Sequence, residues 1–111
     1  MAAILRGEIR WAELGTGTGH EQSGTRPVLV VSHDVFNARS GTAIVVVLTS
    51  QSPRAGFPLT HELTGIRLPK RSWARISQIR TLSTERLGRR VGRLPADQLE
   101  QIILGLREIV G

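Results

Sequence analysis

Two almost unbroken runs of aliphatic and β-branched residues constrain the fold of this chain most. Val28 to Val31 directly follows Pro27, and Ala43 to Leu48 ends at the hydroxyl residues Thr49 and Ser50. Runs of this length are typical of buried strands and are far shorter than the roughly 20 apolar residues of a membrane-spanning helix. Proline is tolerated at the first position of a strand, which fits Pro27. We therefore expect a core built from β-strands and no association with a membrane.

Further segments carry weaker strand signals. Two of them, Glu8 to Leu14 and Trp73 to Leu82, alternate side chains with the period of two that is typical of a half-buried strand. The second of these carries polar residues on both faces, which indicates either a groove lining or an edge strand. A short hairpin that turns at Thr64-Gly65 is predicted within Thr60 to Leu68, and a last strand is predicted at Arg89 to Leu94.

A terminal amphipathic helix is predicted from Pro95 onward. Its apolar residues recur at the spacing i, i+3, i+4, i+7 and i+11, namely Leu99, Ile102, Ile103, Leu106 and Val110. Asp34 to Ser40 is expected to form one helical turn. We predict one domain, residues 1–111, of the mainly β class. Its fold is expected to be a small, strongly bent antiparallel sheet that closes into a barrel, with the helix packed on it.

Positive charge is concentrated in one part of the chain. The stretch from Arg67 to Arg93 holds nine of the fifteen Lys and Arg residues and a single acid, Glu85, so its net charge is +8 while the rest of the chain carries −2. Phosphate backbones are attracted to such surfaces through counterion release. The stretch therefore indicates a polyanionic partner, with a solvated basic face that binds no particular ligand as the alternative.

The composition also argues against several kinds of chemistry. The chain has no cysteine, and its three histidines, His20, His33 and His61, lack the close spacing of a zinc motif. We expect neither a metal nor a cofactor. The segment from Met1 to Gly7 lacks the long apolar region of a secretion signal, so a cytoplasmic location is expected.

Two polar segments are candidates for a functional role. Gly15 to Thr25 contains four glycines among hydroxyl, amide and charged residues, which allows the backbone to approach a ligand closely. Gln51 to Leu59 contains Pro53, Gly56 and Pro58 and is expected to be a loop. Both loops would influence which ligand is selected.

Several strings together resemble the MazF/PemK family of toxin endoribonucleases. They cover nearly the whole chain in the family's order and are Arg6 to Trp11, Gly19 to Val31, Phe36-Asn37, Val46 to Ser50, Ile76 to Leu82, Arg86-Leu87-Gly88 and Val91 to Leu94. The resemblance implies an SH3-like barrel that forms a homodimer and cuts single-stranded RNA, chiefly messenger RNA, at short sequences without a metal. It also implies a cognate antitoxin whose disordered segment folds onto the toxin. The family's catalytic arginine and threonine match Arg26 and Thr49.

Metal-free RNA cleavage uses the substrate's own 2′-hydroxyl as the nucleophile, which suits a chain without a metal motif. A guanidinium matches a phosphate bidentately and keeps its charge, so Arg26 is expected to stabilise the transition state, and the Thr49 hydroxyl is expected to add a donor. Arginine is not deprotonated in proteins, so it is a poor general base. His20 titrates near neutrality and is the candidate acid or base, with Glu21 beside it; a histidine with no catalytic role is the alternative.

RNA-binding residues are expected in the glycine-rich loop, the strand from Trp73 to Leu82 and the basic stretch. The candidates are Glu21, Gln22, Phe57, Arg75, Ser77, Gln78, Arg80 and Arg86. Some relatives have a functional aspartate at the position where this chain has Ser77. The serine argues against a mechanism that needs a carboxylate at this position. Alternatively, the polar side chains of the strand from Trp73 to Leu82 pair with side chains of neighbouring strands and do not contact RNA. Trp11 and Trp73 are expected to pack in the core or in an interface.

Two other functions remain open from the sequence. Related CcdB toxins use the same scaffold to poison DNA gyrase without any enzymatic activity, and a degenerate member of the family would bind RNA without cutting it. The Arg26 and Thr49 pair favours the nuclease, because a gyrase binder would not require it. An acidic antitoxin segment would complement the charge of the stretch from Arg67 to Arg93. The recognised RNA sequence cannot be derived from these residues.

Overall fold

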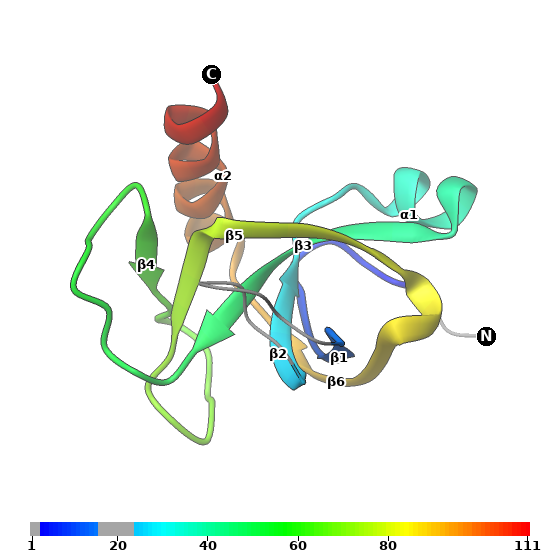
Figure 1. The fold of residues 1–111 in the computed structure, drawn as a ribbon, viewed down its shortest axis with the longest axis horizontal. Helices are drawn as coiled ribbons and strands as arrows, with labels where there is room; N and C mark the ends of the chain where they lie inside the picture. The colour runs from blue at the N-terminus through cyan, green and yellow to red at the C-terminus, as the bar shows by residue number, and fades with distance from the viewer. Residues whose placement is uncertain (1–2, 16–23) are drawn as a thin grey trace.

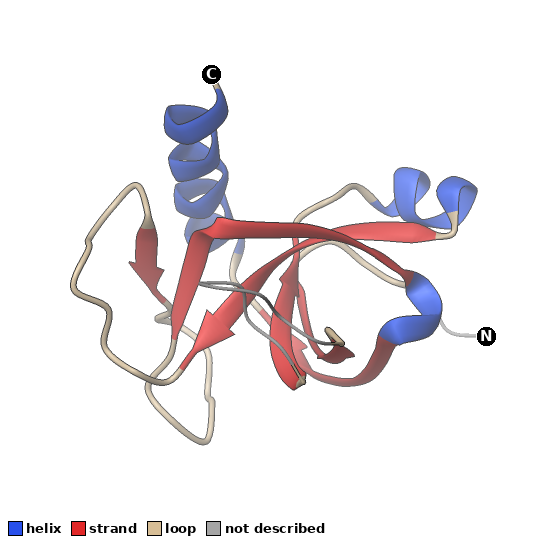
Figure 2. Ribbon diagram, in the orientation of Figure 1, coloured by secondary structure: helices blue, strands red, loops and turns tan. Residues whose placement is uncertain are grey.

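The computed structural model describes residues 3–15 and 24–111 (Figures 1 and 2). Strands dominate this part of the chain, and a long helix follows the last of them. The elements in chain order are β1 (Glu8–Glu13), β2 (Thr25–Val30), α1 (Asp34–Ser40), β3 (Thr42–Thr49), β4 (Thr60–Glu62), β5 (Trp73–Ser83), the 3₁₀ turn η1 (Thr84–Arg86), β6 (Leu87–Arg93) and α2 (Ala96–Val110). Among these described residues, no helix is long and apolar enough to span a membrane.

The described strands form one antiparallel sheet in the order β4-β5-β3-β2-β1-β6. The mainly β class and the bent antiparallel architecture predicted from the sequence are confirmed. Closure of the barrel is not, because the order ends in β4 on one side and β6 on the other, and no pairing joins these two strands in the part of the chain described here. The sheet curls without closing (Figure 1).

A register shift bends β5 near its middle. Val46 of β3 lies opposite Ile79, but the next residue, Val47, lies opposite Arg75, so residues 76–78 have no partner on β3. Extra residues on one strand bend it and increase its twist, and Figure 1 shows β5 turning a corner beside α2. The alternation predicted for Trp73 to Leu82 persists in the burial of the side chains from Ala74 onward, but the two halves of the strand follow different registers on β3, which the sequence did not predict.

The hairpin predicted within Thr60 to Leu68 is also wrong. Strand β4 pairs with the start of β5, with Thr60 opposite Arg75 and Glu62 opposite Trp73. The connection between these strands spans residues 63–72, and the Leu63 amide donates to the Ser72 carbonyl at 2.9 Å. A turn does occur at Gly65, whose φ of +74° suits glycine, but it lies inside this longer connection.

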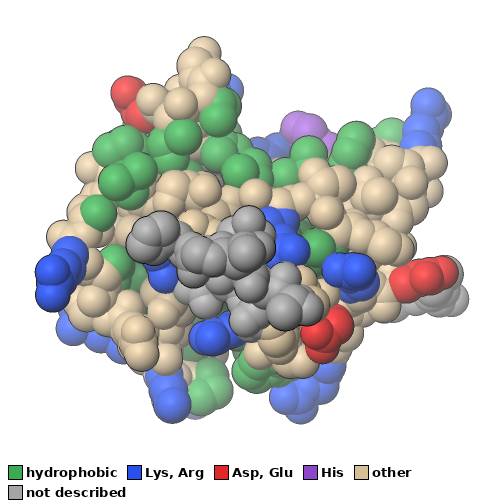
Figure 3. All heavy atoms as spheres, in the orientation of Figure 1, with side chains coloured by type: hydrophobic (Ala, Val, Ile, Leu, Met, Phe, Trp, Pro, Cys, Tyr) green, Lys and Arg blue, Asp and Glu red, His purple; other side chains and the backbone are tan. Residues whose placement is uncertain are grey.

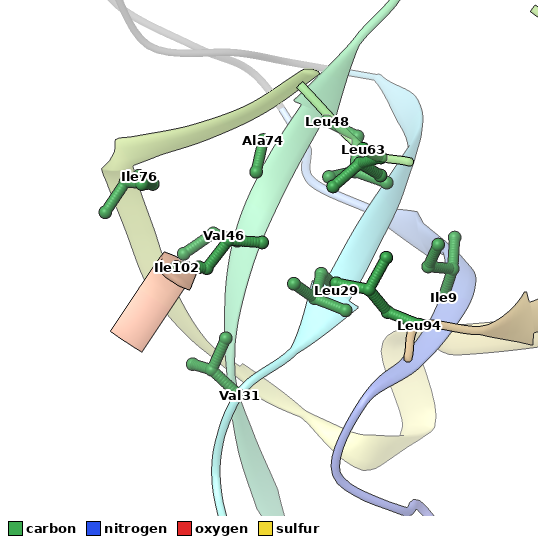
Figure 4. Packing of buried hydrophobic residues seen from close by; sticks show 10 residues of the cluster. All are labelled: Ile9, Leu29, Val31, Val46, Leu48, Leu63, Ala74, Ile76, Leu94 and Ile102. Atoms are coloured by element: carbon green, nitrogen blue, oxygen red, sulfur yellow. The ribbon is translucent and has the colours of Figure 1, made fainter. Parts of the chain in front are cut away.

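Two hydrophobic clusters occupy opposite faces of the central strands. Successive side chains of a strand point to opposite faces, so an unbroken apolar run supplies both. The cluster drawn in Figure 4 lies on the α2 side and contains Ile9, Leu29, Val31, Val46, Leu48, Leu63, Ala74, Ile76, Leu94 and Ile102. The other contains Ala12, Leu14, Val28, Val30, Ala43, Val45, Val47 and Leu82. Burial on both faces explains why β2 and β3 show no alternation in the sequence.

Helix α2 packs on β4 and β5. Its predicted apolar residues Leu99, Ile103 and Leu106 pack against the first cluster, but Val110 is 72% exposed and does not. Ile102 is fully buried in the first cluster. Gly105 faces the corner of β5 so closely that a Cβ atom there would lie 2.7 Å from Ile76 Cδ1, 3.0 Å from the Pro58 carbonyl oxygen and 3.2 Å from Phe57 Cε2. Glycine at this position therefore allows the helix to approach the corner and the loop before β4.

Replacing Gly105 with alanine is expected to destabilise the protein. Alanine normally stabilises a helix interior relative to glycine by about 1 kcal/mol, but the added methyl here overlaps a core side chain and a backbone carbonyl, and overpacking costs about 1–3 kcal/mol. The free energy of unfolding, measured by denaturant titration, should fall in Gly105→Ala.

The matched control is Gly56→Ala, because nothing lies within 4 Å of a Cβ atom at Gly56. Its free energy of unfolding should stay within about 1 kcal/mol of the parent value. A Gly105→Ala protein as stable as the parent would show that the approach of α2 to β5 does not depend on the missing side chain.

A buried ion pair joins the start of β1 to β6. Glu8 is only 2% exposed, and its carboxylate accepts hydrogen bonds from the Leu5 amide at 2.8 Å and from Arg10 Nε at 3.0 Å. Arg90 Nε lies 3.6 Å from the other carboxylate oxygen. Arg10 also donates to the Gly88 carbonyl at 2.9 Å. Both buried charges therefore have partners, as burial requires.

Neutralising Glu8 is expected to destabilise the protein strongly. Glu8→Gln preserves the size of the side chain but leaves the Arg10 guanidinium without a buried counter-charge, and breaking such a pair costs about 3 kcal/mol or more. Thermal or denaturant unfolding measures the loss. Glu108→Gln, at an exposed position of α2, is the control and should change stability by less than about 0.5 kcal/mol. Equal effects of the two substitutions would contradict a structural role for the Glu8 pair.

Candidate functional site

The pairing of β2 with β3 leads toward Arg26 and Thr49. The ladder pairs Val28 with Val47, Leu29 with Val46 and Val30 with Val45. An unchanged register two residues beyond the pair of Val28 and Val47 would set Arg26 opposite Thr49. Arg26 and Thr49 also line the same pocket.

This pocket, which we call the Arg26–Thr49 pocket, has a volume of about 380 Å³. Its apolar lining continues into the first hydrophobic cluster through Ile9 and Leu48, which lie on β1 and β3, on either side of β2 (Figure 4). The other apolar residues around it are Trp11, Pro27, Leu68, Pro69 and Val91, and the polar ones besides Arg26 and Thr49 are Thr25, Ser50, Lys70, Ser72 and Arg89. No carboxylate occurs among the described residues that line it. The pocket thus combines an apolar lining with cationic groups.

A second pocket adjoins the first at Thr49. This Arg75–Ser77 pocket has a volume of about 340 Å³ and is formed by β5 and the loop after β3. Its lining consists of Thr49, Gln51, Ser52, Pro53, Arg54, Ala55, Leu59, Thr60, Arg75 and Ser77. Because Thr49 lines both pockets, they adjoin at this residue, and we refer to the two pockets together as the groove. The structure thus brings Arg75 and Ser77 to Thr49.

The hydroxyl of Thr49 is held by the backbone that follows it. The Gln51 amide donates to Thr49 Oγ1 at 3.1 Å. This bond occupies a lone pair of the oxygen, so the hydroxyl proton can be donated to a ligand. A half-buried threonine whose oxygen is fixed by its own turn is suited to donate a hydrogen bond in one defined direction.

The ends of β1 and β2 are tied together next to Arg26. The Glu13 carboxylate accepts hydrogen bonds from the Gly15 amide at 3.1 Å and from the Thr25 hydroxyl at 2.9 Å. Arg80 reaches this point from β5 and donates to the Leu14 carbonyl at 3.2 Å. Arg80 therefore supports the strand ends from which Arg26 projects. Its predicted contact with RNA stays a prediction.

Not every predicted site residue lies in the groove. His20, Glu21 and Gln22 lie outside the described residues. Of the others, Gln78 lies in the unpaired corner of β5, Arg86 is exposed at the end of η1, and Phe57 lies near Gly105 of α2. None of these last three lines either pocket.

The sequence analysis did not single out Lys70 and Arg89 at the Arg26–Thr49 pocket. The only signal for them was their place in the basic stretch from Arg67 to Arg93. Trp11, expected to pack, is 39% exposed and lines the pocket, whereas Trp73 is buried as expected. Figure 3 shows Lys and Arg side chains around the lower part of one face, with hydrophobic side chains gathered over α2. Positive charge therefore reaches the groove from several elements.

An exposed ion pair holds the segment that carries Lys70. Arg71 donates to both carboxylate oxygens of Glu62, with Nη2 at 2.9 Å from Oε1, and its guanidinium lies 5.0 Å from the centre of the Trp73 ring. The Ser72 hydroxyl donates to the Lys70 carbonyl at 2.9 Å. These contacts fix residues 70–72 between β4 and β5 and so place Lys70 beside the pocket.

The ion pair also shifts the acid–base equilibria of its two members. The hydrogen bond from Arg71 lowers the pKa of the Glu62 carboxyl; desolvation opposes this shift, and the charges of Arg71 and His61 add to it. The same bond raises the pKa of Arg71. Because Glu62 has a lower pKa in the folded chain than in the unfolded one, the pair contributes stability above the ordinary carboxyl pKa and loses it as the pH falls through the lowered value.

An NMR pH titration that follows the Glu62 side-chain carbon tests this arrangement. We expect its midpoint below the ordinary glutamate value in the parent protein and a return toward that value in Arg71→Ala, because the donor is then missing. Arg67→Ala removes a neighbouring exposed cation that forms no described bond to Glu62, and it should leave the midpoint nearly unchanged. Identical titration curves for the parent and Arg71→Ala would refute the pairing.

The fold and the groove together define a class of protein. A bent, open antiparallel sheet with a C-terminal helix carries a cationic groove at the ends of its central strands, which defines a small β protein with a basic surface groove. Residues 5–110 match the family described as PemK-like, MazF-like toxins of type II toxin-antitoxin systems. The chain belongs to this family, and the resemblance noted in its sequence is confirmed.

Curated relatives align over most of the chain. Endoribonuclease MazF6 of Mycobacterium tuberculosis (strain H37Rv) is 39% identical over 110 residues, which cover 96% of each chain. Endoribonuclease EndoA of Bacillus subtilis (strain 168) is 34% identical over 101 residues, which cover 89% of this chain and 87% of the relative. Both relatives are named as endoribonucleases.

Solved structures share the whole fold. MazF from Deinococcus radiodurans superimposes with a TM-score of 0.86 at 26% identity and covers 100% of this chain and 99% of its own. An endoribonuclease from a mycobacterial species, solved in complex with its cognate antitoxin, superimposes with a TM-score of 0.79 at 26% identity, with 98% and 96% covered. The open sheet and the terminal helix are thus the family's architecture.

Proposed function

We propose that this protein is a toxin endoribonuclease that cleaves single-stranded RNA, chiefly messenger RNA, at short sequences in the groove around Thr49. The observation that carries the proposal is that Arg26 and Thr49 line one pocket at the ends of two paired strands. The endoribonuclease names of the curated relatives support the activity. In this proposal the RNA supplies its own nucleophile, the 2′-hydroxyl next to the scissile phosphate, and no metal takes part.

Arg26 and Thr49 would act on the phosphate oxygens. The guanidinium offers a planar fork of donors and a permanent charge, so it neutralises the negative charge that grows on the phosphorane. The Thr49 hydroxyl, with its oxygen held by the Gln51 amide, donates a second hydrogen bond to the same group. Both donors are in place before the substrate arrives, so little reorganisation is needed during the reaction.

Proton transfer needs another residue. Arginine side chains are not deprotonated in proteins, and a threonine hydroxyl is a weak acid, so neither of these two residue types serves as the general base. We assign the role of acid or base to His20, with Glu21 to orient it. A histidine would give the cleavage rate a pH dependence near neutrality.

The groove has room for RNA on both sides of the scissile phosphate. The Arg75–Ser77 pocket extends from Thr49 in one part of the groove, with Arg54 and Arg75 as its cations, and the Arg26–Thr49 pocket extends from the same residue with Lys70 and Arg89. A strand that crosses Thr49 would therefore meet positive charge before and after the cleaved bond. Association with RNA should weaken as salt rises.

The remaining partners belong to the same proposal. A related mycobacterial endoribonuclease has been solved with its cognate antitoxin, and an acidic, disordered antitoxin segment would complement the positive charge between Arg67 and Arg93 and block the groove. Two copies of the chain would form a deeper RNA channel than one, so we propose a homodimer. The proposed site of action is the cytoplasm.

The comparisons favour the nuclease over a CcdB-like gyrase poison. Both curated relatives described above are endoribonucleases, and the matched family is that of PemK-like and MazF-like toxins. A gyrase poison would also have no use for an arginine and a threonine that share one pocket.

Incubation of the purified protein with single-stranded RNA and excess EDTA tests the activity and its site together. We expect specific cuts by the parent protein, and a cleavage rate lowered about 100-fold or more in Arg26→Ala and about 10-fold or more in Thr49→Val, because each change removes a transition-state donor. Mapping the cut ends also reports the sequence that is recognised.

Arg39→Ala is the control, since Arg39 lies exposed in α1 and lines neither pocket of the groove. Its rate should equal that of the parent. Cleavage that requires a divalent metal would contradict the proposed mechanism, and full activity of Arg26→Ala would contradict the proposed site. Trapped gyrase–DNA complexes without RNA cleavage would establish the rival function.

A further inference from the structure

The Arg26–Thr49 pocket has the dimensions and lining of a site for one nucleotide. Ligand pockets generally measure about 300–1,000 Å³ and combine an apolar lining with a few polar groups, and this one encloses about 380 Å³. Trp11 is partly exposed at the pocket and offers a flat aromatic surface, while Leu68 and Val91 supply further apolar area. Unstacked RNA bases bind to such surfaces through their faces.

The charged groups among the described residues of the pocket can only donate hydrogen bonds. Lys70 and Arg89 line it together with Arg26, and an ammonium or a guanidinium has no acceptor. The hydroxyls of Thr25, Ser50 and Ser72 serve either as donors or as acceptors, and no described carboxylate lines the pocket. The balance of the described lining is therefore strongly toward donors.

A donor-rich pocket distinguishes bases by their exocyclic groups. Guanine and uracil present a carbonyl oxygen where adenine and cytosine present an amino group. A carbonyl accepts a hydrogen bond from a cation, whereas an amino group would point its own protons at the positive charge and leave the cation without a partner. At this one exocyclic position, guanine and uracil therefore offer an acceptor to a cation, whereas adenine and cytosine offer donors.

The position of Lys70 is built into the structure. The next residue, Arg71, donates hydrogen bonds from two nitrogens to the Glu62 carboxylate, and its guanidinium lies over the Trp73 ring. The Ser72 hydroxyl donates a hydrogen bond to the Lys70 carbonyl. These contacts hold the backbone at Lys70, so less of the chain has to be ordered on binding than in an unrestrained loop. Lys70 thus presents its ammonium group from a fixed backbone position.

We infer that the Arg26–Thr49 pocket receives a base next to the scissile phosphate and selects a keto base, guanine or uracil, through Lys70 and Arg89. This inference rests on the proposed function, since it takes the phosphate to lie on Arg26 and Thr49. It deepens that function by assigning the chemical kind of base at one position of the recognised sequence.

Uracil and cytosine provide the matched pair of probes, because they have the same ring size and differ at the exocyclic group of C4. We would measure the affinity of the parent protein for oligodeoxyuridine and oligodeoxycytidine of equal length by fluorescence anisotropy; neither can be cleaved, because both lack the 2′-hydroxyl. The parent should bind the uracil oligomer about tenfold or more tightly, the discrimination expected of one good base contact. Lys70→Glu should abolish or reverse this preference, because a carboxylate accepts from an amino group.

Arg67→Glu is the control for Lys70→Glu, because it changes the charge by the same amount in the same segment but lies outside the pocket lining. It should weaken both oligomers equally and keep the preference for uracil. Sequencing the ends produced from a random RNA library should show guanine or uracil enriched at a nucleotide flanking the cut in the parent, and reduced enrichment in Lys70→Glu.

The outcomes separate this inference from the proposed function. Cleavage of RNA with equal binding of the two oligomers, or with a preference that Lys70→Glu leaves unchanged, overturns the inference and keeps the nuclease. Absence of RNA cleavage overturns the nuclease, while the two oligomers still report whether the pocket selects a keto base. A preference of the parent protein for cytosine contradicts the donor argument directly.

Discussion

The pairing of β2 with β3 is the constraint on which the rest of the structure depends. These two strands lie at the centre of the sheet and supply side chains to both hydrophobic clusters. A slip of the register by one residue would exchange the faces of one strand, so the buried valines would no longer match their neighbours on either side. The same two strands carry Arg26 and Thr49 to one pocket. Stability of the core and assembly of the groove are thus two results of a single alignment.

Much of the fold was predictable because its strongest signals are local. The unbroken runs of β2 and β3 and the helical period of α2 are properties of short segments, and the family strings identified Arg26 and Thr49. The corner in β5 and the pairing of β4 were not predictable, because they depend on distant contacts. Residues 76–78 leave the ladder where α2 packs closely through Gly105, and no periodicity within Trp73 to Leu82 encodes that neighbour. Closure of the sheet was overestimated for a similar reason: strand patterns do not say whether the two edges meet.

The site was predictable only in part. Charge counting indicated that residues between Arg67 and Arg93 meet a polyanion, but it could not say which of nine cations reach the groove. That choice is made by the contacts that hold each backbone segment. Lys70 reaches the pocket because Arg71 pairs with Glu62, and Arg80, from the same basic stretch, instead donates to the Leu14 carbonyl. Which cations reach the groove therefore depends on tertiary contacts, and a single sequence does not show these contacts.

The close approach of α2 at Gly105 brings the C-terminal helix to the loop before β4. A Cβ atom at Gly105 would lie within 3.2 Å of Phe57 and Pro58, and these residues belong to the same connection between β3 and β4 whose other members line the Arg75–Ser77 pocket. The helix therefore supports the loop that forms one wall of the groove. A partner that moved α2 away from the sheet would shift this wall and widen the groove without contacting Thr49. The C-terminal helix could in this way alter the shape of the groove from a distance.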